Sequence, residues 1–168
     1  LCLWVDVETL DPFDAVAASR LAFEQLRLGL FGEDGPDWPQ LREVYRRDWV
    51  SRTRMLALEG DGTPEQRATF LQEILEREAR DPAEALRRYT EFATVNRRHL
   101  VCVVVDNLDH LSDASPVLTW ALARYRAMFA LVTVAMEDST LWRLRSNGRD
   151  VLDGQQPEQF WLHRPKVR

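Results

Sequence analysis

Several features that mark particular protein classes are scarce or missing in this 168-residue sequence. Two cysteines, both inside apolar runs, are too few for a disulfide scaffold and indicate buried free thiols in a reducing compartment. No apolar run approaches the ~20 residues that cross a bilayer, and no signal peptide precedes the first apolar run. We therefore expect a cytoplasmic protein without a membrane span.

Basic residues are also in the minority, with 22 Lys and Arg against 27 Asp and Glu and a net charge of −5. Surfaces that bind nucleic acid are usually rich in positive charge, so a nucleic-acid partner is not expected. The apolar content of 45% and the charged content of 29% are typical of a globular domain. The chain starts at Leu1 without a methionine and enters an apolar run at once, so we expect a piece of a longer protein.

What the sequence does contain is an unbroken apolar run that ends in acids. Residues 100–105 (LVCVVV) lead directly into Asp106, Asn107 and Asp109. The run has no alternation of polar and apolar residues and is rich in valine, which favours a central strand of a parallel sheet covered on both faces. Ligands of such sheets lie just beyond the carboxyl ends of the strands, so these polar side chains are candidates for a functional site.

Similar apolar runs and helix-start signals outline the rest of the chain. Strands are expected at 1–7, 100–105, 129–136 and 160–164. Proline directly after Asp, Thr or Ser suits the cap and first position of a helix. This pairing occurs at Asp11, Thr63, Asp81 and Ser115. With apolar residues at helical spacing, it predicts helices near residues 12–31, 39–58, 64–80, 82–98, 116–128 and 139–146.

Strands that alternate with helices predict an α/β fold, in which a parallel sheet is flanked by helices. The connection between the first two strands is far longer than a crossover needs, so residues 32–98 are predicted to form a helical insertion. Residues 1–31 would supply the first strand and helix, and residues 99–168 the acidic strand end, the third strand and the C-terminal part. We expect the whole to be an incomplete domain.

Residues 103–111 (VVVDNLDHL) resemble the Walker B strand of P-loop NTPases of the signalling (STAND) and KAP-like group. That strand has apolar residues, then Asp, then Asp or Asn, an aliphatic residue and another Asp. Residues 1–7 resemble the strand after the phosphate-loop helix, and residues 129–136, followed by EDST, resemble the strand that carries the first sensor. The resemblance implies a sheet order of 5-1-4-3-2. In this order residues 1–7, 100–105 and 129–136 are strands 2, 3 and 4, and the expected strand at 160–164 would be strand 5.

The resemblance also implies a site for ATP and Mg²⁺. Asp106 would coordinate the magnesium ion, Asn107 would orient the groups around it, and Asp109 would activate the attacking water. Thr133 and Glu137 match the region of the sensor and would contact the nucleotide. An acid at position 137 has the alternative role of capping the helix that follows.

The sequence departs from this group in two places. It contains no G-x-x-x-x-G-K-[ST] phosphate loop, and the glycines at 31–39 and 59–64 lie in acidic loops that would repel phosphate. The phosphate loop is therefore expected upstream of Leu1, and the chain alone is expected to be inactive. Asn107 stands where many relatives have a glutamate that activates water, which predicts the slow turnover of a signalling or regulatory switch.

Two other hypotheses use parts of the same chain. In the first, the chain is a non-catalytic α/β interaction module, and its helical region 32–98 contacts a protein partner or a second copy. In the second, Asp106, Asp109 and His110 form a metal centre that hydrolyses phosphate esters without a phosphate loop. An exposed position in a turn is the simpler alternative for His110.

Overall fold

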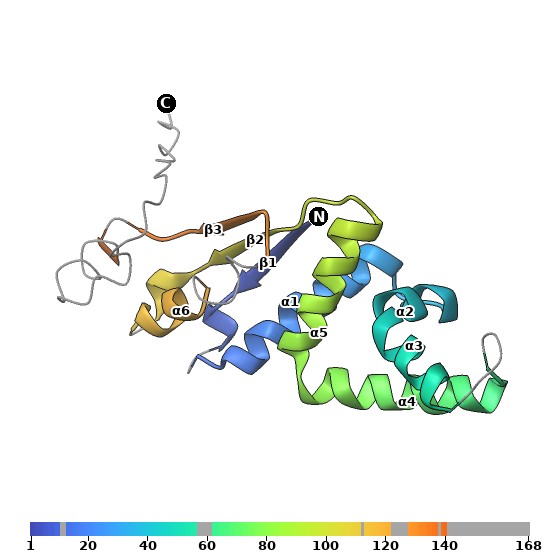
Figure 1. Ribbon diagram of the computed structural model, residues 1–168. Helices are drawn as coiled ribbons and strands as arrows, with labels where there is room; N and C mark the ends of the chain where they lie inside the picture. The colour runs from blue at the N-terminus through green and yellow to red at the C-terminus, as the bar shows by residue number, and fades with distance from the viewer. Residues whose placement is uncertain (11–12, 57–61, 112, 122–127, 138, 141–168) are drawn as a thin grey trace.

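The computed structural model describes residues 1–10, 13–56, 62–111, 113–121, 128–137 and 139–140 (Figure 1). Three strands, β1 (Cys2–Asp6), β2 (Cys102–Asp106) and β3 (Leu131–Val134), form one parallel sheet in the order β1-β2-β3. The predicted α/β class with a parallel sheet is confirmed, and the first two strands are neighbours as expected. The strand predicted at 160–164 and nearly all of the helix predicted near 139–146 lie outside the described residues.

One face of the sheet is covered by helices. Leu3 and Val5 of β1 pair in register with Val103 and Val105 of β2, and all four side chains are at most 2% exposed. On the opposite face, Trp4 is 51% exposed. The expectation of cover on both faces is therefore wrong for the described part of the chain. Before the aspartate that ends each of these strands, successive residues are all apolar, yet only every second one is buried.

The cysteines lie on this open face. Cys2 and Cys102 are direct partners in the strand register, and both are free thiols. Cys2 is exposed and Cys102 is half-buried, so the prediction of buried thiols is wrong. The reason is the same one-sided cover: alternate residues of each strand face away from the described helices.

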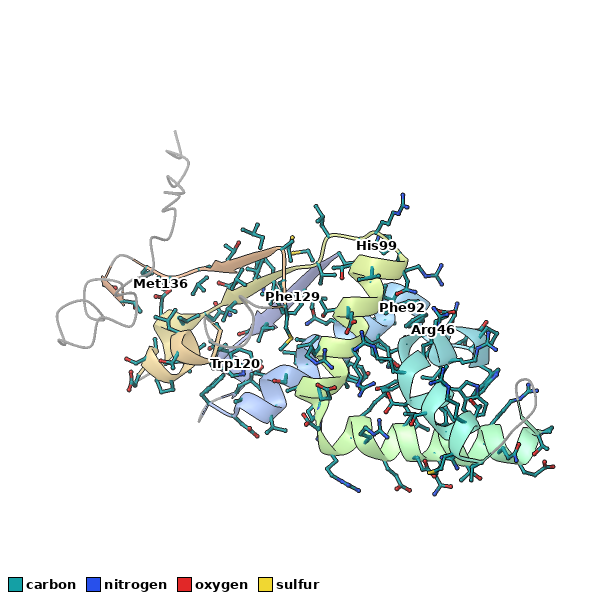
Figure 2. All side chains as sticks on the ribbon, viewed as in Figure 1. Arg46, Phe92, His99, Trp120, Phe129 and Met136 are labelled. Atoms are coloured by element: carbon teal, nitrogen blue, oxygen red, sulfur yellow. The ribbon has the colours of Figure 1, made fainter. Side chains whose placement is uncertain are left out.

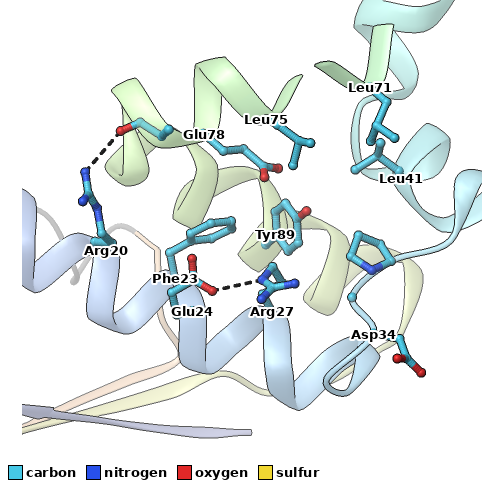
Figure 3. Close-up of a pocket in the computed structure, with 13 residues that line it drawn as sticks. Arg20, Phe23, Glu24, Arg27, Asp34, Leu41, Leu71, Leu75, Glu78 and Tyr89 are labelled. Carbon is cyan, nitrogen blue, oxygen red and sulfur yellow. Dashed lines mark hydrogen bonds and ion pairs between the residues drawn. The ribbon is translucent and has the colours of Figure 1, made fainter. Parts of the chain in front are cut away.

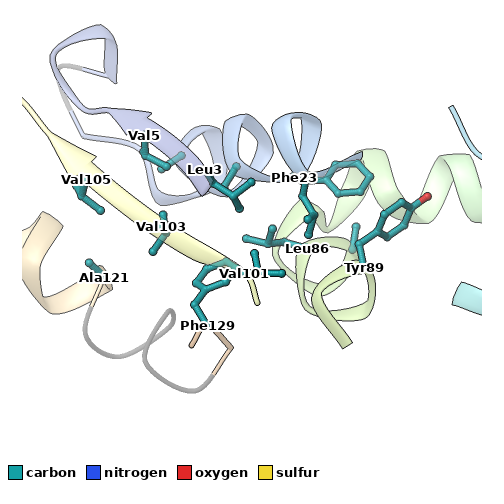
Figure 4. Packing of buried hydrophobic residues seen from close by; sticks show 14 of the residues in the cluster. Leu3, Val5, Phe23, Leu86, Tyr89, Val101, Val103, Val105, Ala121 and Phe129 are labelled. Atoms are coloured by element: carbon teal, nitrogen blue, oxygen red, sulfur yellow. The ribbon is translucent and has the colours of Figure 1, made fainter. Parts of the chain in front are cut away.

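The covered face packs against α1 (Ala15–Phe31), and α1 packs in turn against α5 (Pro82–Glu91) (Figure 4). Phe23 of α1 meets the ring of Tyr89 of α5 edge-on, with 5.0 Å between ring centroids. Each large apolar side chain buried in this way contributes roughly 1.5–3 kcal/mol. At the other end of the sheet lies Trp120 of α6 (Ser115–Trp120), labelled in Figure 2. Its ring centroid is 5.3 Å from that of Phe13.

Three further helices, α2 (Trp38–Val44), α3 (Arg46–Met55) and α4 (Pro64–Arg80), lie between α1 and α5 in the chain. Their own core is aromatic: the Trp49 ring lies 4.9 Å from Trp38 and 5.0 Å from Phe70. The single helix predicted at 39–58 is broken at Tyr45, where ψ is 29°. Tyr45 is 1% exposed, and its hydroxyl donates to Glu78 of α4 at 2.8 Å, so a tertiary contact holds the break.

The helix starts follow the predicted chemistry with two shifts. Thr63 forms a reciprocal capping box with Gln66 at the start of α4, as the sequence indicates. Asp14 caps α1 in place of Asp11, because its carboxylate accepts from the Val16 N–H at 2.8 Å. At α6 the carboxylate of Asp113 accepts from the Ser115 N–H at 2.9 Å, and Ser115 is already helical. The predicted helix 82–98 ends at Glu91 and continues as a π-helical turn, Phe92–Asn96.

Candidate functional site

Two aspartates lie side by side at the carboxyl end of the sheet. Asp6 ends β1 and Asp106 ends β2, and they are direct partners in the strand register. Paired residues of neighbouring strands point to the same face, so both carboxylates belong to the open face, and both are half-buried. The pairing extends by one hydrogen bond past the strand, from the Val7 N–H to the Asp106 carbonyl at 3.2 Å.

Asn107 connects the two aspartates. Its backbone N–H donates to Oδ1 of Asp106, and its side-chain Nδ2 donates to Oδ1 of Asp6, both at 2.9 Å. The residue has a left-handed conformation, with φ of 64° and ψ of 28°, which asparagine tolerates better than most residues. The sharp turn that follows β2 therefore fixes the geometry of the two carboxylates.

Asp109 lies in the 3₁₀ turn Leu108–His110 that follows β2, and Leu108 anchors this turn in the core with 0% exposure. Its Oδ1 accepts from the backbone N–H of Glu137 at 2.7 Å. The carboxylate thus joins the end of β2 to the segment after β3. This contact brings together two of the residues predicted for the site, Asp109 and Glu137.

Thr133 lies further from the aspartates. It is the register partner of Val104, two residues before Asp106, which corresponds to about 7 Å along the strand. Its side chain is exposed and shares the open face with Asp106. Glu137 is exposed as well and contacts the site through its backbone. The structure thus gathers Asp106, Asn107 and Asp109 at one edge and leaves Thr133 on the adjoining surface.

His110 points to a different neighbour from the one expected for a metal centre. Its Nδ1 lies 3.5 Å from Oε1 of Glu8, and both side chains are more than half exposed. Within the described ranges, no three His, Cys, Asp or Glu side chains are grouped closely enough to hold a metal ion. Asp106, Asp109 and His110 therefore do not form the compact metal centre of the phosphohydrolase hypothesis.

The donor set does fit a magnesium ion that keeps most of its water. Mg²⁺ is usually held by one or two carboxylates, with waters and substrate phosphates as the other ligands. Asp6 and Asp106 provide two carboxylates on one face, and Asn107 fixes the orientation of both. These are the two side chains that would hold such an ion.

Asp6 was not among the site residues predicted from the sequence. Its signal is the parallel between the two strand ends: each apolar run closes with an aspartate four residues after a cysteine. The strand register aligns Asp6 with Asp106 and so brings the two similar strand ends together in space.

No match to this chain is found among protein-family models, curated proteins or solved structures. In the part of the chain that the structure describes, no helix has both the length and the apolar character needed to cross a membrane. Function is therefore inferred from the residues and contacts of the chain itself.

Proposed function

We propose that this chain carries the magnesium-binding part of a P-loop ATPase that acts as a slow signalling or regulatory switch in the cytoplasm. The observation that carries the proposal is the pair Asp6 and Asp106 at the carboxyl end of a parallel sheet, tied together by Asn107. This is where ligands of α/β sheets bind. The sequence motif at 103–111 has the Walker B pattern at the same place.

The two edges of the sheet support this assignment. At the β1 edge, the side-chain amide of Gln25 binds both backbone groups of Trp4, accepting from its N–H at 2.6 Å and donating to its carbonyl at 2.5 Å. That edge is closed to another strand. Among the described residues no side chain covers the outer edge of β3 in this way, and Leu131 there is 56% exposed. A strand that carries a phosphate loop, from sequence outside these 168 residues, would add beside β3.

Each residue at the site then has a distinct role. Asp106, with Asp6 beside it, would hold the magnesium ion, and Asn107 would orient both carboxylates through its two hydrogen bonds. Asp109 would orient the attacking water with the oxygen that does not bind Glu137. Thr133 and Glu137 would contact the nucleotide. When bound, magnesium would neutralise charge on the phosphates. Because Asn107 stands where many relatives have a glutamate that activates water, Asp109 is left to act on the water, and we expect slow turnover.

The test is ATP hydrolysis by the protein that includes a phosphate loop, compared with its Asp106→Asn variant. We expect the loss of one magnesium carboxylate to lower the rate at least 100-fold, measured as phosphate release at saturating Mg²⁺. Asp34→Asn, which removes an exposed acid in the loop between α1 and α2 and outside the site, is the matched control and should hydrolyse ATP at the wild-type rate.

Unchanged ATP binding and hydrolysis in Asp106→Asn would contradict the proposal and favour the interaction module. The observation that favours the module as a second candidate is on α4, where Leu71 is 40% and Leu75 56% exposed. Hydrolysis of p-nitrophenyl phosphate by the 168-residue chain alone, dependent on added metal, would instead favour the phosphohydrolase.

A further inference from the structure

A cavity of about 570 Å³ lies among α1, α2, α4 and α5 (Figure 3). Its volume is within the range of roughly 300–1,000 Å³ that holds small-molecule ligands. Apolar side chains form most of its wall, among them Phe23, Leu41, Leu71, Leu75 and the ring of Tyr89. The cavity is thus large enough for a small organic molecule and suited to an apolar one.

One of the charged groups in the wall is a buried carboxylate. Glu78 of α4 is only 7% exposed, and its Oε1 accepts from the Tyr45 hydroxyl at 2.8 Å. No Lys or Arg forms an ion pair with it in the described part of the chain, although buried acids are usually paired. Burial raises the pKa of Glu78, and the hydroxyls of Tyr45 and Tyr89 and the charge of Arg27 oppose this shift only in part. The buried carboxylate is therefore incompletely compensated.

The two arginines of the cavity wall already bind other groups of the protein. Nε of Arg27 binds Glu24 at 3.0 Å, and Nη2 of Arg20 donates to the Ala79 carbonyl at 3.2 Å (Figure 3). Both lie on α1 at the wall of the cavity. An anionic ligand would find their remaining N–H groups, but it would also face the carboxylates of Glu24 and Glu78 in the same wall. The charges of the cavity thus favour a cationic ligand over an anionic one.

A second buried polar atom of the wall lies beside this carboxylate. Tyr89 is 0% exposed, and its hydroxyl interacts electrostatically with Glu78 but forms no hydrogen bond of good geometry with any described group. It points toward the same region as the Glu78 carboxylate (Figure 3). A buried hydroxyl without a well-formed hydrogen bond is uncommon in native proteins, and a bound ligand would supply one.

We propose that this cavity binds a small primary amine with an aliphatic or aromatic body. The ammonium group would pair with Glu78 and donate a second hydrogen bond to the Tyr89 hydroxyl, and the Phe23 ring lies in the same wall. The body would pack on Leu41, Leu71 and Leu75, which accounts for the exposure of the last two. This site is independent of the proposed ATPase function.

Binding of 2-phenylethylamine, measured by isothermal titration calorimetry at pH 7.5, tests the proposal. The matched probe is 2-phenylethanol, which has the same body and no charge. We expect the amine to bind at least 10-fold more tightly than the alcohol to the wild-type protein. Glu78→Gln, which keeps an acceptor for Tyr45 but removes the charge, should abolish that preference.

Tyr89→Phe is the second variant, because it removes only the hydroxyl and keeps the ring in the core. It should weaken amine binding several-fold and leave the alcohol unaffected. Circular dichroism melting of each variant establishes that it is folded, and if Glu78→Gln unfolds, Tyr89→Phe decides the outcome. Equal affinities for amine and alcohol, no detectable amine binding at millimolar concentration, or an unchanged preference in a folded variant would overturn the proposal.

Discussion

At the scale of single residues, Asn107 has two separate functions in the turn after β2. Its backbone adopts the left-handed conformation, and its side chain holds Asp6. Alanine can supply neither, whereas glycine supplies the conformation without the side chain. The two substitutions therefore separate the cost of the turn from the value of the hydrogen bond.

We expect Asn107→Ala to lower the free energy of unfolding by roughly 2–3 kcal/mol and Asn107→Gly by about 1 kcal/mol. The difference between the two losses measures the strain of a Cβ atom at positive φ. The loss in Asn107→Gly measures the contribution of the hydrogen bond to Asp6. Urea denaturation followed by far-UV circular dichroism measures both. Equal losses in the two variants would show that the left-handed backbone carries no cost here.

Glu78 gives a residue-scale prediction on pH. Because its pKa is raised in the folded state, the protonated form is favoured by folding, and that contribution is lost as pH rises through the folded-state pKa. At pH 8 the buried charge therefore destabilises the protein, and Glu78→Gln should be more stable than wild type by about 1 kcal/mol. At pH 4, below the ordinary glutamate pKa, the gain should disappear. Unfolding in urea at both values measures this, and a variant less stable than wild type at pH 8 would contradict it.

Sequence patterns revealed some site residues and not others for a simple reason. Asp106, Asn107 and Asp109 form one local motif, which can be read without knowing the fold. Asp6 becomes part of the site only through its register with Asp106, and that pairing joins residues that are far apart in the sequence. The buried state of Glu78 is equally hidden, because Glu78 lies on a helix whose other acids are exposed.

At the scale of elements, Asp48 of α3 links the helices of the insertion. It pairs with Arg77 of α4 at 2.7 Å and with Arg88 of α5. Burial raises the pKa of Asp48, but the hydrogen bonds from both arginines outweigh it and hold the pKa below its usual range. One carboxylate thus joins three helices.

We expect Asp48→Asn to lower the free energy of unfolding by about 2 kcal/mol at pH 7, since it leaves two guanidinium groups without their anion. A depressed pKa contributes stability above the unfolded-state value, near 4, and loses it as pH falls through the folded-state pKa. The difference between variant and wild type should therefore shrink below pH 4. Thermal melts between pH 3 and 7 measure it.

The control for this prediction is Arg87→Ala on the solvent side of α5. Arg87 pairs with Glu84 at 2.7 Å, but its side chain is 48% exposed. Exposed pairs contribute little, so we expect a change below about 0.5 kcal/mol. If Arg87→Ala lowered the free energy of unfolding as much as Asp48→Asn, the ion pairs of Asp48 would stabilise the protein no more than an exposed pair does.

Helix boundaries could be predicted where local chemistry sets them and could not where packing does. The start of α4 is fixed by Thr63, proline and Gln66, all adjacent in the sequence. The break between α2 and α3 falls at Tyr45, in a segment without glycine or proline. It depends on burial of that ring and on its bond to Glu78, 33 residues away in the chain.

At the scale of the whole molecule, the parallel sheet and the long helical crossover could be predicted, and the one-sided cover could not. Trp4, Val104 and Leu131 are as apolar as the residues they alternate with, so the sequence predicts burial on both faces. In the described part of the chain Trp4 stays 51% and Leu131 56% exposed. The apolar pattern of the strands therefore predicts that both faces are covered, but it does not identify the segment that covers each face.

The distance in sequence between β1 and β2 has a consequence for how the chain is made. The hydrogen bond between Leu1 and Leu100 spans 99 positions. At roughly 5–20 residues per second, a ribosome takes about 5–20 s to travel that far. During this interval β1 has been made and β2, its partner in the sheet, has not. The helices between the two strands are made first, and α1 packs on β1 in the folded structure, so we expect α1 to cover the apolar residues of β1 before β2 pairs with them.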